Sequence, residues 1–117
     1  YYNAIEVYEM VLVKKPSHTA THYKLGTTNY AIRDYAKAAE WFEKVASFDS
    51  LGYPLSTYYK GASLKRLGKY DEAIKAFETF KKTSFKKEPL DVAALKKTID
   101  KEIEGCNLGI KQMAEKT

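Results

Sequence analysis

The stretch KLGTTNYAIRDYAKAAEWFEKV, residues 24–45, has a near copy further along the chain in KGASLKRLGKYDEAIKAFETF, residues 60–80. Superposing the two places Gly26 on Gly61, each inside a segment that otherwise has helical character. Glycine costs a helix about 1 kcal/mol relative to alanine, so a repeated glycine predicts a close contact between paired helices that excludes a side chain. The other matching pairs are Tyr35 with Tyr70, Ala38 with Ala73, and Phe42 with Phe77.

A third copy is cut off at the N-terminus, where Ala4 takes the place of Ala38 and Pro16 marks the end of a helix. Offsets of 34 and 35 residues between the copies indicate an array of supersecondary units, each predicted to be two helices. Helices are expected at residues 19–32, 35–48, 55–67 and 70–83. The single predicted domain comprises the second helix of a truncated repeat at 1–16, repeats at 19–50 and 54–85, and a capping helix at 89–115.

Beyond Pro89 the repeat gives way to one long amphipathic helix. Its apolar residues are spaced by threes and fours, which predicts one buried stripe of Val92, Leu95, Ile99, Ile103, Cys106, Ile110 and Met113. The opposite face is predicted to be solvated and carries Lys96, Lys97, Asp100, Lys101, Glu104 and Lys111. A polar-backed helix suits the end of a solenoid. Gly105 and Gly109, one turn apart, predict a close contact with a neighbouring helix.

The repeated residues resemble the tetratricopeptide repeat family over about residues 1–85. The matching positions are Ala4, Ile5, Tyr8, Pro16, Leu25, Gly26, Asp34, Tyr35, Ala38, Phe42, Asp49, Gly61, residues 68–74 and Phe77. The sequence departs from the family at the tryptophan position, which holds His22 and Thr57, and at a closing proline, which is Ser50. The resemblance implies an all-α, right-handed solenoid of about two and a half repeats, closed by the long C-terminal helix.

The segment IEGCNLGIKQMAEKT, residues 103–117, has a shorter resemblance. It is similar to the helix that joins tetratricopeptide repeats to a β-propeller in envelope proteins ending in an OmpA-like, peptidoglycan-binding domain. Such proteins include a component of the bacterial type IX secretion system. The resemblance implies the repeat region of a larger periplasmic protein tethered to the outer membrane, with any targeting segment upstream of a fragment that begins inside a repeat. A cytosolic adaptor of the same fold is the alternative.

The composition narrows the classes of function. A chain of 117 residues suits one small domain, and its single cysteine excludes an internal disulfide. No apolar run is long enough to span a membrane, so we expect no membrane insertion. The net charge is +5, with late lysines at Lys81, Lys82, Lys86, Lys87, Lys96 and Lys97. These lysines are interpreted as a solvated face, because no nucleic-acid module or interleaved stacking aromatics accompany them.

No catalytic, metal or cofactor motif is found in the sequence. His18 and His22 are four residues apart, a spacing that can bind a metal on a helix. No cysteine or carboxylate stands near them, so we interpret both as surface histidines. Cys106 is interpreted as a small buried side chain rather than a reactive thiol. No phosphate loop or nucleophile motif occurs, and the chain is therefore expected not to be an enzyme.

The expected functional surface is a groove lined by the first helix of each unit, as the resemblance implies. Its predicted peptide-binding residues are Tyr23, Lys24, Thr27, Tyr30, Tyr58, Tyr59, Ala62, Lys65 and Arg66. Tyrosine supplies apolar area and a hydroxyl, and lysine or arginine can hold a carboxylate. We therefore expect a protein-interaction domain whose ligand is a protein or peptide with acidic groups. Two alternatives stay open: the tyrosines pack against one another or the last helix, or the domain is a passive spacer.

Overall fold

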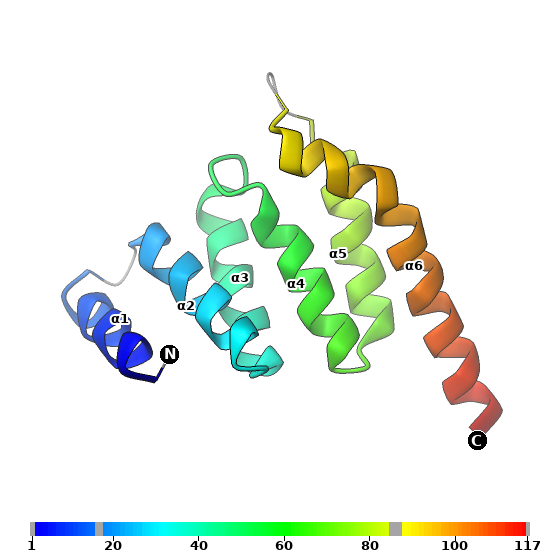
Figure 1. The fold of residues 1–117 in the computed structure, drawn as a ribbon, viewed down its shortest axis with the longest axis horizontal. Coiled ribbons are helices and arrows are strands. Elements are labelled where there is room, and N and C mark those ends of the chain that lie inside the picture. The colour runs from blue at the N-terminus through cyan, green and yellow to red at the C-terminus, as the bar shows by residue number, and fades with distance from the viewer. Residues whose placement is uncertain (1, 16–17, 85–87, 117) are drawn as a thin grey trace.

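A computed structural model describes residues 2–15, 18–84 and 88–116, and over these ranges the chain contains helices and no strand. The helices are α1 (Tyr2–Lys14), α2 (Thr19–Ala31), α3 (Tyr35–Asp49), α4 (Leu55–Arg66), α5 (Tyr70–Lys82) and α6 (Leu90–Lys116). Each helix packs on the next in sequence, so they form a row with α1 at one end and α6 at the other (Figure 1). The all-α solenoid with a long C-terminal helix is thereby confirmed.

Three of the residues considered in the sequence fall outside the described ranges. They are Pro16, predicted to end the first helix, and the lysine pair Lys86 and Lys87.

The row of helices measures 47 × 38 × 20 Å, so the molecule is flat rather than spherical. A flat array leaves much helix surface exposed to solvent, and hollows open between its helices.

The turn inside each helix pair has the same backbone in both copies. Arg33 and Gly68, which are 35 residues apart, both take a left-handed conformation, with φ of 65° and 78°. The next residues, Asp34 and Lys69, each donate their amide to a carbonyl five residues earlier, at 2.8 and 2.9 Å. This bond belongs to the helix ending in which a left-handed residue satisfies otherwise unpaired carbonyls. The repeat is therefore a property of the backbone as well as of the sequence.

The repeated glycines are each covered by a phenylalanine ring from the following helix. A Cβ atom added at Gly26 would lie 2.8 Å from the ring of Phe42, and one added at Gly61 would lie 2.9 Å from the ring of Phe77. Both rings are fully buried. The predicted close contact is present, but it joins a ring to a helix backbone. The phenylalanine ring occupies the space that a side chain at the glycine would need.

A hydrophobic core cluster lies between α4, α5 and α6, and its buried members are Leu64, Ala73, Phe77, Phe80, Val92, Ile99 and Cys106. Burial raises the pKa of the Cys106 thiol, which is fully enclosed as predicted. The apolar stripe of α6 is not covered along its whole length, because Met113 is 54% exposed. The helix has 27 residues against 13 in α5, and its C-terminal turns extend past the helix it packs on (Figure 1).

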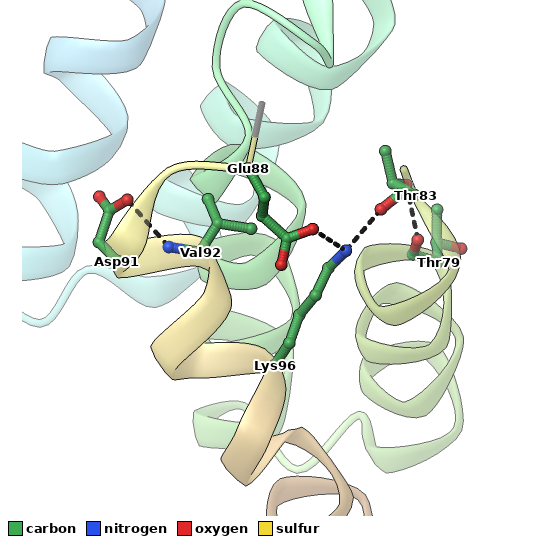
Figure 2. A network of polar contacts seen from close by, with 6 residues as sticks. All are labelled: Thr79, Thr83, Glu88, Asp91, Val92 and Lys96. Carbon is green, nitrogen blue, oxygen red and sulfur yellow. Dashed lines mark hydrogen bonds and ion pairs between the residues drawn. The ribbon is translucent and has the colours of Figure 1, made fainter. Parts of the chain in front are cut away.

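Polar contacts of Lys96 join the first turns of α6 to the end of α5 (Figure 2). Its ammonium donates to the carbonyl of Thr83 at 2.6 Å and to the carboxylate of Glu88 at 3.0 Å. The last carbonyls of a helix lack intrahelical partners and favour a cation nearby. The prediction that places Lys96 on the solvated face is therefore wrong, and its side chain is only 18% exposed. The other predicted outer-face residues of α6 are exposed: Lys97, Asp100, Lys101, Glu104 and Lys111.

His22 is buried, contrary to the surface position expected for it. Its ring lies 5.4 Å from that of Trp41 and 5.5 Å from that of Phe48. The Nδ1 atom of His22 lies 2.9 Å from the carbonyl of His18, so the buried imidazole has a polar partner. His22 therefore acts as an aromatic filler between α2 and α3, while His18 remains exposed.

Candidate functional site

A groove of about 560 Å³, which we call the α4–α6 groove, opens between these two helices. Its walls come from four helices and comprise Tyr30 of α2, Tyr58, Ala62, Lys65 and Arg66 of α4, Tyr70 of α5, and Glu102, Gly105, Leu108, Gly109 and Gln112 of α6. Five of the nine predicted binding residues line it. The structure thus brings Tyr30 and four of the five predicted residues of α4 together with a wall that the prediction lacked.

Two glycines of α6 shape the floor of the α4–α6 groove. A Cβ atom added at Gly105 would lie 2.9 Å from the Nζ atom of Lys65, and one added at Gly109 would lie 2.5 Å from the ring of Tyr70. Residues four apart share one face of a helix, so both glycines receive side chains from α4 and α5. The close contact predicted for this glycine pair is confirmed.

The two cations predicted to hold a carboxylate differ in their surroundings. Lys65 lies 3.1 Å from Glu102 across the groove, and both side chains are 33% exposed. Arg66 is exposed, with its guanidinium 5.9 Å from the centre of the Tyr35 ring. An ion pair this open to water contributes about 0–1 kcal/mol, because solvent screens it. A carboxylate from a ligand can therefore replace Glu102 at Lys65 at small cost, or bind Arg66 directly.

The tyrosines of α2 and α4 form a connected set of ring contacts. Tyr59 stacks on Phe42 with ring centres 5.5 Å apart, and Tyr23 meets the same phenylalanine edge-on at 5.8 Å. Neither of these tyrosines lines the groove. The ring of Tyr59 also meets those of Tyr30 and Tyr58, and the ring of Tyr23 meets that of Tyr53. For Tyr23 and Tyr59, the alternative in which the tyrosines pack against one another is therefore confirmed. Edge-to-face and offset stacking of this kind stabilises a core beyond simple burial.

Tyr30 and Tyr58 both pack against other aromatic rings and line the groove. Tyr58 meets Phe77 and Phe80 with ring centres 5.7 and 5.5 Å away, and it also lines the groove wall. Burial raises the pKa of the Tyr58 hydroxyl, and the carboxylate of Glu102 raises it further. The hydroxyl therefore keeps its proton at neutral pH and can donate a hydrogen bond to a ligand.

The remaining predicted residues, Lys24 and Thr27, lie away from the groove. The Nζ atom of Lys24 lies 5.9 Å from the centre of the Tyr8 ring of α1. The hydroxyl of Thr27 donates to the carbonyl of Lys24 at 3.0 Å. Both residues are exposed on α2. They are not part of the groove because it forms one unit further along the array, where α6 supplies the second wall.

Six lining residues were not predicted from the sequence: Tyr70, Glu102, Gly105, Leu108, Gly109 and Gln112. The predicted lining comes from the first helices of the repeats alone, and the predicted role of α6 is only to cover the last repeat. One signal was present, because the glycine pair already indicated that another element comes close to α6. Leu108 was a second signal in the sequence, because it is an apolar residue outside the predicted buried stripe. In the structure its side chain is 55% exposed.

A second hollow, of about 730 Å³, lies between α3 and α5. Its charged lining is balanced, with Glu40, Glu43 and Glu72 against Lys60, Lys69 and Lys75. Its remaining lining residues are alanines, leucines, serine and threonines, with no aromatic side chain among the described residues. The α4–α6 groove contributes three tyrosines instead, and tyrosine is enriched where binding energy concentrates. We therefore take the smaller groove as the candidate site.

No family model matches the chain, and no curated protein matches it significantly. Among the described helices, none combines the length and apolar character that crossing a membrane requires. Within the same residues, no group of histidine, cysteine and acidic side chains is arranged to hold a metal ion. The class that the fold defines is an all-α array of consecutively packed helices, ended by a long helix that forms one wall of a groove.

Proposed function

We propose that the chain is a non-catalytic protein-interaction domain and that a segment of its partner binds in the α4–α6 groove. The observation that carries this proposal is the composition of the groove. Three tyrosines and the exposed Leu108 supply apolar contact, while Arg66 and a screened Lys65–Glu102 pair supply charge. Tyrosine and arginine are the residues in which interface binding energy most often concentrates.

The partner segment we propose is apolar with acidic groups. Its apolar side chains would lie on Leu108 and the tyrosines, and a carboxylate would bind Arg66 or take the place of Glu102 at Lys65. Charge-assisted hydrogen bonds from arginine or lysine to carboxylates are among the stronger polar contacts in proteins. A ligand carboxylate therefore gains more here than a neutral group would.

We also propose that the array is a tetratricopeptide repeat domain. The support is the recurrence, at a spacing of 35 residues, of the glycine–phenylalanine contact and of the left-handed turn residue. A place in a periplasmic, outer-membrane-associated protein of the type IX secretion system rests only on the sequence resemblance of residues 103–117. A cytosolic adaptor remains the alternative location for the same binding function.

Nuclear magnetic resonance with the ¹⁵N-labelled chain tests the binding site. The probe is a short peptide of alternating leucine and glutamate, and its control carries lysine in place of glutamate. We expect the acidic peptide to shift the amide signals of Ala62, Gly105 and Gly109, and the basic peptide to leave them in place. Shifts confined to α3 and α5 would instead assign binding to the second hollow.

A passive spacer is the second candidate function. It is favoured by the packing of Tyr23 and Tyr59 into the core and by the pairing of Lys65 within the chain. A spacer would show no saturable shift with either peptide. The same titration therefore separates the two functions.

A further inference from the structure

The side chain of Lys65 crosses the α4–α6 groove from α4 and ends on α6. Its Nζ atom lies 3.1 Å from the carboxylate of Glu102. The same atom lies close to the backbone of Gly105, where an added Cβ would be 2.9 Å from it. Residues three apart on a helix are neighbours on its surface, so Glu102 and Gly105 together receive this ammonium group. A side chain at position 105 would take the space of the ammonium, and the ion pair therefore depends on the glycine.

Glu102 is the only acidic side chain among the described residues that line the groove. The other charged lining residues are the cations Lys65 and Arg66. The carboxylate of Glu102 therefore opposes the binding of an anion in two ways. It pairs with one of the two cations, and it repels an incoming carboxylate through its own charge.

The Lys65–Glu102 pair contributes little to the stability of the fold, because solvent screens an ion pair that is this exposed. Its effect is on the ligand. A carboxylate from a ligand can accept the hydrogen bond of the ammonium in place of Glu102. A neutral side chain is a weaker acceptor, so it leaves the pair intact across the groove.

We propose that Glu102 determines the charge specificity of the α4–α6 groove by holding Lys65 in the place of a ligand's carboxylate. A ligand that carries a carboxylate exchanges with Glu102 at Lys65, whereas a neutral ligand does not. The natural groove therefore binds acidic segments less tightly than its two cations alone would allow. This inference rests on the proposed binding function and identifies the residue that regulates that same site.

Calorimetric titration of the whole 117-residue chain with the leucine–glutamate peptide tests this proposal. Glu102→Gln removes the charge and keeps the size of the side chain, and it should bind the peptide about threefold to fivefold more tightly. Glu104→Gln makes the same change in net charge on the exposed face of α6 and should alter the affinity by less than about twofold. A leucine–glutamine peptide with blocked ends should bind the natural chain and Glu102→Gln equally.

Lys65→Met separates competition for Lys65 from a general effect of charge. In this background, Glu102→Gln should change the affinity for the acidic peptide by less than about twofold, because no ammonium is left to release. A gain that persists without Lys65 would overturn the proposal.

The same titrations distinguish this inference from the proposed function on which it rests. Equal affinity of the natural chain and Glu102→Gln for the acidic peptide would overturn the inference and leave the binding function standing. Binding to neither chain would overturn both. Binding to Glu102→Gln alone would support the inference and contradict the proposed function of the natural chain.

Discussion

At the scale of single residues, the two glycine–phenylalanine contacts define the helix pairs. Each glycine lowers the helix propensity of its own helix but lets a phenylalanine ring pack directly on the helix backbone. Phe42 packs on Gly26, and Phe77 packs on Gly61. A fully buried phenylalanine contributes roughly 2–3 kcal/mol through removal of its surface from water. That gain exceeds the cost of about 1 kcal/mol for a glycine inside a helix. The exchange explains why the glycine recurs.

Gly26→Ala tests this contact. The added Cβ would lie 2.8 Å from the Phe42 ring, so we expect a net loss of about 1–3 kcal/mol in the free energy of unfolding. Combining it with Phe42→Leu, which makes room, should recover part of the loss in chemical denaturation. Lys37→Ala on the exposed side of α3 is the matched control and should change stability by less than about 0.5 kcal/mol. A stabilised Gly26→Ala variant would contradict the contact.

Substitutions at the two left-handed turn residues are predicted to change the free energy of unfolding in opposite directions. Gly68→Ala should destabilise by about 1 kcal/mol through backbone strain alone, because nothing lies within 4 Å of the added Cβ. Arg33→Gly relieves the same strain in the first unit and should stabilise by roughly 0.5–1 kcal/mol. Urea denaturation of both variants provides the measurement. Shifts of the same sign would show that the two turns are not equivalent.

At the scale of helices, α6 combines two functions. One face of α6 closes the core through Val92, Ile99 and Cys106, which are fully buried. In the C-terminal half of the same helix, Gly105 and Gly109 contact side chains of α4 and α5 and line the groove. A terminal helix that covers the last repeat is what a solenoid requires at its end. Here the covering helix also supplies the second wall of the candidate site.

The Lys96 contact to α5 gives the first prediction at this scale. Lys96→Met leaves the carbonyl of Thr83 and the carboxylate of Glu88 without this partner, so we expect a loss of about 1–2 kcal/mol. Lys97→Met, its exposed neighbour, should change stability by less than about 0.5 kcal/mol. Thermal unfolding monitored by circular dichroism compares the two. Equal losses would mean that the Lys96 contacts are not what stabilises this junction.

Removal of residues 90–117 tests the covering role of α6. The deletion uncovers the buried faces of Phe77, Phe80 and Leu64, which pack against it in the core cluster. The shortened chain should aggregate or melt at a markedly lower temperature, because the uncovered end of a solenoid needs a cover. Gel filtration and thermal melts provide the measurement. A monomeric shortened chain with an unchanged melting temperature would show that α5 needs no cover.

At the scale of the whole molecule, the sequence predicts the repeated helices well and the features outside the repeat less well. Matching residues at one period placed α2 to α5 within a few residues, because helix patterns and turn residues are local. The burial of His22 was missed because the identity of a side chain does not reveal its neighbours, here Trp41 and Phe48. The outer position assigned to Lys96 failed for the same reason. The α4–α6 groove depends on how a non-repeated helix crosses the array, and no period in the sequence encodes that.

The most direct test of the central claim is the affinity of the leucine–glutamate peptide, measured by calorimetry at low and high salt. Two variants with the same change in net charge are compared: Lys65→Glu with Arg66→Glu in the groove, and Lys97→Glu with Lys101→Glu on the exposed face of α6. We predict that the groove variant binds at least about tenfold more weakly at low salt, because two cations near the ligand become anions. Salt should shrink the difference, because exposed charges are screened over about 8–10 Å. Weakened binding in the outer-face variant, with the groove variant unaffected, would contradict the assignment of the α4–α6 groove as the binding site.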